Sequence, residues 1–347
     1  MKLLICTQVV DSQDPILGFF HRWIEEFAKH CEEVRVICLR AGTHSLPENV
    51  FIHSLGKEKG GGRLLYIWHF YKYAWSLRKK YDTVFVHMNP EYVVLMGLPW
   101  RLLGKKISLW YSHKSVTLWL RIATLLAQQI FSTTSHAMRI KSRKVSFVGH
   151  GIDLTRFDLL PIPSTPVRIL YIGRVTPIKR IDLMLETFLE MVNRGHEIFF
   201  DIVGDIGSDK DKYFQEKLFS MIPEVLKSRV IFYGSVPQQG IKQFLSRAHV
   251  FYNFSPSGGM DKAVLEAMAC GVAPVVTNEA FKEMLNSYPD LYLDDQASIE
   301  KLAGATEKAI ELAKVEASRN KLRTAIVSHA SLESLVIKIM QGSTIVH

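Results

Sequence analysis

The sequence is poor in cysteine and contains no long apolar run. Its 347 residues include four cysteines, Cys6, Cys31, Cys38 and Cys270, whose spacing fits neither a disulfide framework nor a zinc site. No stretch reaches the roughly 18 consecutive apolar residues of a membrane-spanning helix, and the apolar start at residues 1–6 is too short for a secretory signal peptide. We therefore expect a cytoplasmic protein without disulfides and without a membrane-spanning helix.

Positive charge is distributed unevenly along the chain. The formal net charge is +9, and residues 1–160 hold 22 Lys and Arg against 12 Asp and Glu, whereas the remainder is nearly balanced. A basic first half favours an anionic partner, such as membrane headgroups, a phosphorylated acceptor or nucleic acid. Because the sequence has no aromatic platform or recognition helix typical of nucleic-acid-binding proteins, we expect no nucleic-acid partner.

Short runs rich in β-branched and aromatic residues alternate with helical stretches in both halves. Strands are expected at 2–6, 34–39, 83–87, 107–112 and 129–133, and again at 167–173, 198–204, 229–234, 250–254 and 273–277, with helices such as 19–30 and 64–80 between them. This alternation predicts α/β domains in which helices cover both faces of a parallel sheet.

A proline-rich break at 158–166 separates the two halves. We predict two Rossmann-like doubly wound domains, 1–160 and 161–330, that face each other across a cleft. The C-terminal helix at 331–347 is expected to be able to pack back on the first domain. Ligands of such sheets bind beyond the C-terminal ends of the strands.

The stretch 254–278 predicts a strand end, a loop, a helix and a further strand. Ser255 to Gly259 can continue neither a strand nor a helix, and Asp261 is suited to cap the helix that follows. A glycine-rich loop that opens onto a helix N-terminus suits a phosphate, because it offers unpaired N–H groups and the positive end of the helix dipole. Glu266, one turn into the helix, is placed to accept two hydroxyls of a ribose. The alternative is a solvated Glu beside a loop without a ligand.

A second candidate phosphate element follows the strand at 167–173. Gly173 lets the backbone approach a ligand closely, Arg174 offers a planar fork for phosphate oxygens, and Lys179 adds a mobile charge. Two such cations would stabilise a departing diphosphate without a metal. The alternative is a basic helix N-terminus exposed to water, although cations at that position oppose the helix dipole.

These motifs together resemble a known enzyme family. Gly173-Arg174 with Lys179, Gly204-Asp205, Gly234-Ser235-Val236 and the run LEAMACG followed by PVV occur in the order and spacing of the retaining GT-B glycosyltransferases of the glycogen-synthase-like group, the glycosyl transferases group 1. The resemblance covers most of residues 145–280, and the first half resembles the family only in layout. It implies transfer of a sugar from a nucleotide-diphosphate sugar to a glycan or lipid-linked acceptor, with retention of anomeric configuration and without a metal or a cofactor.

The resemblance also implies roles for individual residues. Arg174 and Lys179 would hold the donor diphosphate, Glu266 its ribose, and the main chain of Tyr233 to Val236 its base. In place of a second Glu that contacts the sugar ring in the family, this sequence has Gly258, and Asp261 and Lys262 are candidates to replace its contacts. The full set expected at the donor is Gly173, Tyr233, Gly234, Ser235, Val236, Gly258, Gly259, Met260, Asp261, Lys262 and Glu266.

The first half offers fewer candidates. His113 follows an expected strand, where several family members have a His that contacts the donor sugar. Asp14, Gly18 and His21 lie in and after the first loop, which family members use for the acceptor. Asp209-Lys210-Asp211 has the spacing of a metal-binding Asp-x-Asp motif but lacks further ligands nearby, so no metal site is expected.

Residues 64–81 are aromatic and basic. They predict either a helix at a membrane interface, with Arg78, Lys79 and Lys80 on lipid phosphates, or a core helix with a basic end. An anionic membrane surface, peripheral and at the inner face, is therefore a candidate partner. Two other functions remain open from the sequence: a nucleotide-sugar epimerase of the same fold and a non-catalytic nucleotide-sugar-binding protein.

Overall fold

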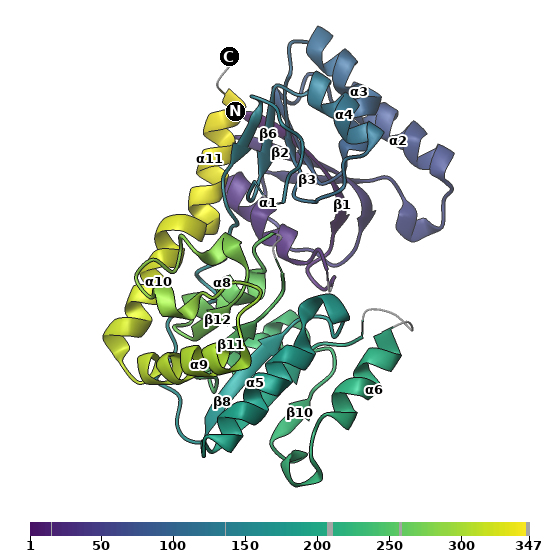
Figure 1. Ribbon diagram of the computed structural model, residues 1–347. Helices are drawn as coiled ribbons and strands as arrows, with labels where there is room; N and C mark the ends of the chain where they lie inside the picture. The colour runs from purple at the N-terminus through teal and green to yellow at the C-terminus, as the bar shows by residue number, and fades with distance from the viewer. Residues whose placement is uncertain (15, 136, 207–210, 257–258, 345–347) are drawn as a thin grey trace. The chain divides into compact units, whose positions relative to one another are not determined.

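The computed structural model describes residues 1–14, 16–135, 137–206, 211–256 and 259–344 (Figure 1). The chain divides into two compact units, Met1–Gly151 with Leu332–His347, and Ile152–Ser331. The division therefore falls nine residues before the expected boundary at 160. The reason is that Ile152, Phe157 and Leu160 are buried in the core of the second unit.

The first unit contains a seven-stranded parallel sheet. Its order is β3-β2-β1-β4-β5-β6-β7, with β1 (Lys2–Val10), β2 (Glu33–Ala41), β3 (Val50–Ser54), β4 (Thr83–His87), β5 (Lys106–Trp110), β6 (Gln129–Ser132) and β7 (Val145–Phe147). The five expected strands are confirmed. The two that the sequence did not predict, β3 and β7, are the edge strands, which are short and only partly buried.

Helices cover both faces of this sheet. On one face α1 (Phe19–His30) and α11 (Leu332–Thr344) share a core cluster, to which Trp23 and Val336 belong. On the other face α2 (Arg63–Ser76), α3 (Pro90–Leu102) and α4 (Leu118–Leu126) share a second cluster. Glycine at 342 lets α11 approach Phe131 of β6, because a Cβ there would lie 2.8 Å from its ring.

Helix α2 is a surface helix. Of its residues only Phe70 and Ala74 are buried. The interpretation of this segment as a core helix is therefore wrong, and its remaining aromatic side chains face outward or lie at the helix margins.

The second unit contains a five-stranded parallel sheet in the order β10-β9-β8-β11-β12. Its strands are β8 (Val167–Ile172), β9 (Ile198–Val203), β10 (Val230–Phe232), β11 (Val250–Asn253) and β12 (Ala273–Val276), and its helices are α5 (Ile181–Asn193), α6 (Lys212–Ser220), α7 (Ile241–Leu245), α8 (Lys262–Ala269), α9 (Ile299–Ala313) and α10 (Glu316–Ala330). The strand order reverses between β8 and β11, and in open α/β sheets the crevice at such a reversal is where ligands bind.

Two expectations from the sequence concern disulfides and membrane-spanning helices. All four cysteines are free and buried. Within the described ranges no helix is both long and apolar enough to cross a membrane.

Candidate functional site

Three neighbouring strands of the second sheet end in glycine. Gly173, Gly204 and Gly234 follow β8, β9 and β10, and the Gly204 N–H donates to the Gly234 carbonyl at 2.8 Å. The Gly173 N–H donates in turn to the Val203 carbonyl at 2.9 Å. This edge of the sheet therefore presents main chain rather than side chains, which lets a ligand approach the backbone closely.

The central glycine of this row has no alternative residue. A Cβ at Gly204 would lie 1.9 Å from the Gly173 carbonyl oxygen, and its φ of +137° is one that residues with a side chain rarely adopt. The loops that begin at Gly173 and Gly204 are thus packed against each other through their backbones.

An ion pair crosses the reversal point of the sheet. The Lys179 ammonium, from the turn after β8, lies 3.0 and 2.8 Å from the two carboxylate oxygens of Asp261, from the loop after β11. Asn253 at the end of β11 donates to the same carboxylate at 2.6 Å. The first candidate phosphate element and the second are therefore brought together, although 82 residues separate Lys179 and Asp261 in sequence.

Asp261 does not cap α8 with its side chain. The residue occupies the N-cap position, but its carboxylate is directed to Lys179 and Asn253, and it makes no side-chain hydrogen bond to the first turn. The capping prediction is wrong because a charged partner outcompetes a neutral N–H for this carboxylate. The first turn of α8 therefore has no side-chain cap, and the Val264 N–H donates to the Asp261 carbonyl at 3.2 Å. The N-terminus of the helix still favours an anion through its dipole.

Arg174 is exposed and precedes Lys179 by five residues in the sequence. Its carbonyl accepts a hydrogen bond of 2.9 Å from the buried Tyr171 hydroxyl, which anchors the main chain at this position. Its guanidinium makes no ion pair with any residue that the structure describes. The backbone is thus fixed while the guanidinium remains available, as a phosphate ligand requires.

Glu266 and Lys262 lie one turn apart on α8 in a poorly solvated position. Burial raises the pKa of Glu266 to about 7, against the opposing effect of Lys262 and Arg156. Burial likewise lowers the pKa of Lys262 to about 7, opposed by Glu266. A carboxyl group whose pKa is raised toward neutrality by burial is typical of functional sites.

The Glu266 titration gives a testable pH dependence. A carboxylate accepts two hydroxyls better than a protonated carboxyl, so donor affinity should fall as pH decreases through about 7. Between pH 8 and pH 6 we expect the Kd of an intact nucleotide-diphosphate sugar to rise about tenfold by calorimetry, because one proton must be displaced on binding. The intact sugar nucleotide is used because a terminal phosphate itself titrates near pH 6.

Glu266→Gln is the matched control. It should bind more weakly at pH 8 and lack the fall in donor affinity as pH decreases through about 7, although Lys262 still titrates in this interval. An equal change of donor affinity with pH in the wild type and the variant would contradict the assignment of Glu266 to the ribose.

The Tyr233 side chain is part of a structural network. Its hydroxyl donates to the buried Asp201 at 3.3 Å, and Asp201 also pairs with Arg168 at 3.0 Å and Arg247 at 3.1 Å. Because the ring is held in this network, only the main chain around Gly234, Ser235 and Val236 is left to recognise a base, as the resemblance implies.

The loop before α8 is described only in part. Gly258, where the family has a Glu, lies outside the described residues. Gly259 is held through its carbonyl, which accepts a hydrogen bond of 3.1 Å from Asn278 at the end of β12, and Met260 packs on the core. The anchoring asparagines, Asn253 and Asn278, were not predicted; their signal is a polar residue at or directly after the end of a buried strand.

In the first unit, His113 lies in the loop after β5. Its Nδ1 accepts a hydrogen bond of 3.0 Å from the Ser115 N–H, so the neutral ring carries its proton on Nε2. The ring is exposed, and it lies edge-on to Tyr111 with centroids 6.5 Å apart. This side chain is therefore free to donate to a ligand at the C-terminal edge of the sheet.

The expected acceptor residues are engaged elsewhere. His21 is buried; its Nδ1 donates to Glu25 at 2.9 Å, and its Nε2 accepts from the Ser45 N–H at 3.2 Å. Asp14 accepts from the N–H groups of Ile16 and Leu17 through one oxygen and pairs with Arg40 through the other.

Gly18 closes the same turn, where a Cβ would lie 2.5 Å from the Asp14 carbonyl. These three residues shape the first loop, and none offers a free group to an acceptor. These contacts stabilise the loop, and its assignment to the acceptor stays a prediction.

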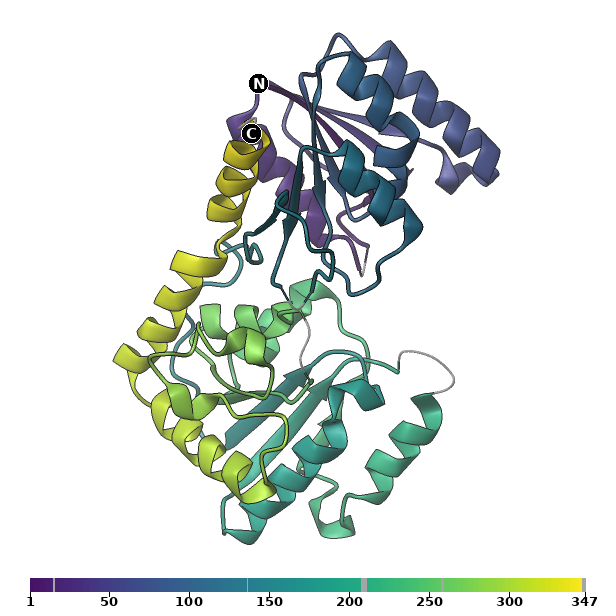
Figure 2. The ribbon, with the colours of Figure 1, turned by 45° about the horizontal axis from the view of Figure 1, so that its top comes forward.

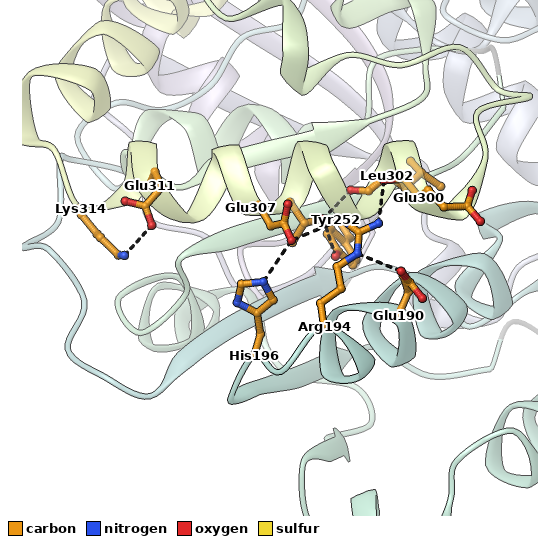
Figure 3. A network of polar contacts seen from close by, with 10 residues as sticks. Glu190, Arg194, His196, Tyr252, Glu300, Leu302, Glu307, Glu311 and Lys314 are labelled. Carbon is orange, nitrogen blue, oxygen red and sulfur yellow. Dashed lines mark hydrogen bonds and ion pairs between the residues drawn. The ribbon is translucent and has the colours of Figure 1, made fainter.

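A cavity lies at the opposite edge of the second sheet. It measures about 740 Å³ and is lined by residues at the starts of β8 and β9, such as Val167 and Ile198. Four carboxylates line it, and Figure 3 shows Glu307 of α9 between His196 and Arg194, at 3.1 and 3.3 Å. This cavity lies at the N-terminal ends of the strands, whereas ligands of such sheets bind beyond the C-terminal ends, which supports the other edge as the donor site.

The structure describes only part of the Asp-x-Asp motif. Asp209 lies outside the described residues, and Asp211 is the N-cap of α6. Among the residues with described positions, no three His, Cys, Asp or Glu side chains are grouped closely enough to hold a metal ion.

Comparison with known proteins finds a family model that matches part of the second unit. Residues 166–311 match the family described as glycosyl transferases group 1. The chain is similar to a putative colanic acid biosynthesis glycosyltransferase, WcaL, of Escherichia coli K12, with 30% identity over 143 residues that cover 39% of this chain and 34% of the relative. It is also similar to a component of the phosphatidylinositol N-acetylglucosaminyltransferase of Arabidopsis thaliana, with 27% identity over 176 residues, 49% of this chain and 37% of the relative. The chain thus spans about a third of the length of the curated relatives it matches.

A solved structure extends the likeness to both units. The crystal structure of Anabaena Alr3699/HepE in complex with UDP superposes with a TM-score of 0.73 at 14% identity and covers 98% of this chain and 99% of that one. At this identity the likeness concerns the fold, and it confirms the predicted pair of Rossmann-like domains. Residues 166–311 therefore match the glycosyl transferases group 1 family, and the chain has the GT-B fold.

Proposed function

We propose that the protein transfers a sugar from a nucleotide-diphosphate sugar to a glycan or lipid-linked acceptor. The donor is assigned to the second unit and the acceptor to the first. No cofactor takes part, the nucleotide-diphosphate sugar being a substrate. The curated relatives support this assignment, since their names describe glycosyltransferases, and HepE was crystallised with UDP.

One observation carries the proposal: Arg174, Lys179 and the first turn of α8 are brought to one edge of the sheet, at its reversal point. All three favour an anion, and Gly173 and Gly204 remove the side chains that would keep a diphosphate from the backbone. Asp261, which holds Lys179 at 2.8 Å, keeps the ammonium in place before a donor binds.

These groups suggest how the reaction proceeds. The bond between the anomeric carbon and the diphosphate oxygen breaks, and Arg174 and Lys179 stabilise the charge that builds on the leaving phosphate. The acceptor hydroxyl attacks from the same face, and its proton passes to the leaving phosphate oxygen. This front-side displacement retains the anomeric configuration and needs no carboxylate nucleophile. Because cations and a helix N-terminus already face the diphosphate, we propose that no metal is required.

The described carboxylates also bear on the epimerase alternative. Such an enzyme needs an acid and a base beside the sugar. Asp14 is paired with Arg40 and bonded to two N–H groups, and Asp11 lies 3.9 Å from the same Arg40, so both carboxylates already have a cationic partner within the first loop. This favours the transferase.

The surplus of cations in residues 1–160 supports an acceptor held at an anionic membrane. We propose a peripheral enzyme at the inner face of a membrane, whose acceptor is a lipid-linked glycan precursor.

The test is sugar transfer or hydrolysis across a panel of nucleotide-diphosphate sugars, each with and without EDTA. We expect one or more donors to be consumed at the same rate in both conditions. Complete loss with EDTA that Mn²⁺ or Mg²⁺ restores would contradict metal independence. Tight binding of a sugar nucleotide without turnover of any donor, with the acceptor analogues supplied, would favour the non-catalytic alternative.

A further inference from the structure

The outer sides of α2, α3 and α4 expose an unusual amount of apolar surface. Half of the large hydrophobic side chains that are exposed among the described residues lie on these three helices. On α2, Leu64 is 84% and Trp68 56% exposed, and on α3 Leu102 is 80% exposed. The full set, which we call the α2–α4 surface, is Leu64, Leu65, Ile67, Trp68, Tyr71, Trp75, Leu98, Leu102, Leu118, Trp119 and Leu125.

The three helices form one continuous surface. The Tyr71 hydroxyl of α2 donates to the Leu95 carbonyl of α3 at 3.0 Å, and Gly97 of α3 packs against Leu126 of α4. A shallow groove of about 670 Å³, lined mainly by Trp68, Trp75 and Met96, runs between α2 and α3. Figures 1 and 2 both show the three helices side by side on the first unit.

The charges on this surface have one sign. Neither α2 nor α4 contains an Asp or Glu, and α3 has only Glu91, in its first turn. Cations accompany the tryptophans: Lys72 lies over the Trp68 ring at 5.0 Å, and Arg78 over the Trp75 ring at 4.8 Å. Arg101 and Arg121 are exposed on the neighbouring helices.

We propose that the α2–α4 surface lies on an anionic lipid bilayer, with its tryptophans and leucines inserted to headgroup depth. Exposed Trp, Tyr and Leu beside cations, without carboxylates, is the composition of a membrane-interface surface. A second copy of the chain is a poorer occupant, because two surfaces of the same charge would repel. The inference rests on the proposed function for the nature of the acceptor, since a lipid-linked acceptor is reached at such a surface.

The α2–α4 surface adds a hydrophobic contribution to the electrostatic attraction between the protein and an anionic bilayer. Charge alone predicts binding that salt abolishes, because the Debye length falls from about 10 Å at 0.1 M to 3 Å at 1 M. Buried apolar side chains are not screened, so part of the binding should persist at high salt.

The test is sedimentation of the full chain with phosphatidylcholine vesicles, with and without phosphatidylglycerol, at about 0.1 M and 1 M salt. We expect binding to the anionic vesicles, part of which survives at high salt. Replacing Trp68 and Trp75 together by Ser should weaken binding about tenfold and abolish the salt-resistant part. Charge reversal of Arg78, Lys79 and Lys80 should weaken binding at low salt only. Tyr213→Ser removes an aromatic side chain on α6 that is 80% exposed, against 56% for Trp68 and 52% for Trp75, and this control should bind as the wild type.

Three results would overturn the inference. They are no binding to either vesicle, wild-type binding by the tryptophan variant, and self-association through these residues instead of vesicle binding. Because the experiment contains no sugar nucleotide, it is independent of the donor site. Sugar transfer without vesicle binding would contradict the inference about the α2–α4 surface but not the proposed sugar transfer. Vesicle binding without sugar transfer would contradict the proposed transfer but not the inference about the surface.

Discussion

Replacing Arg174 or Lys179 by alanine should lower turnover about 10²–10³-fold, the usual loss for one donor of positive charge to a transition state. Each cation is expected to act on the diphosphate as it departs, so kcat should fall more than donor affinity. The measurement is transfer with the donor identified in the panel, at saturating and limiting concentration. Wild-type turnover in both variants would contradict the assignment.

The Lys179 variant needs a control for its ion pair. Its removal leaves the Asp261 carboxylate with Asn253 as a hydrogen-bond donor, and a pair this close to solvent contributes about 1 kcal/mol or less to stability. Thermal unfolding should therefore change little. Lys308→Ala removes a more exposed lysine–aspartate pair of 2.9 Å, with Asp290, beside the cavity at the opposite edge of the sheet, and should transfer sugar as the wild type. Equal loss in both variants would indicate a general effect of charge rather than a diphosphate site.

Replacing Gly204 by alanine should destabilise the second unit by roughly 3–5 kcal/mol, because overpacking and backbone strain add at this position. Its Cβ would lie 1.9 Å from a backbone oxygen that cannot move without breaking the strand ends, and its φ of +137° is unfavourable for alanine. Urea unfolding followed by circular dichroism measures the loss.

Gly195→Ala separates the two contributions. Gly195 also has a positive φ, of +88°, but no atom lies within 4 Å of the Cβ position. Only backbone strain remains at this position, so Gly195→Ala should lower the free energy of unfolding by about 1–2 kcal/mol. If Gly204→Ala costs no more than Gly195→Ala, the close approach of the two loops is not a constraint on folding.

Some of the site follows from local chemistry alone. Gly173, Gly204 and Gly234 are recognisable because each follows a β-branched run, and such runs end at one edge of a parallel sheet. The helix bounds of α1 were predicted to the residue, since its apolar residues repeat at helical spacing. The intramolecular contacts of the first-loop residues could not be predicted, because a free Asp, Gly or His and a structural one look alike in sequence. Only the contacts of Asp14 with Arg40 and of His21 with Glu25 distinguish them.

The sequence by itself determined the class of fold, the two-domain organisation and the candidate cations for a diphosphate. These depend on periodicity and on residue types at strand ends, which are local. Only the tertiary structure decided that Lys179 meets Asp261, that Ile152 belongs to the second core, and that α2 lies on the surface with its tryptophans exposed. Such outcomes depend on which distant segments compete for the same contact, and an aromatic helix has the same periodicity whether its outer side is covered or exposed.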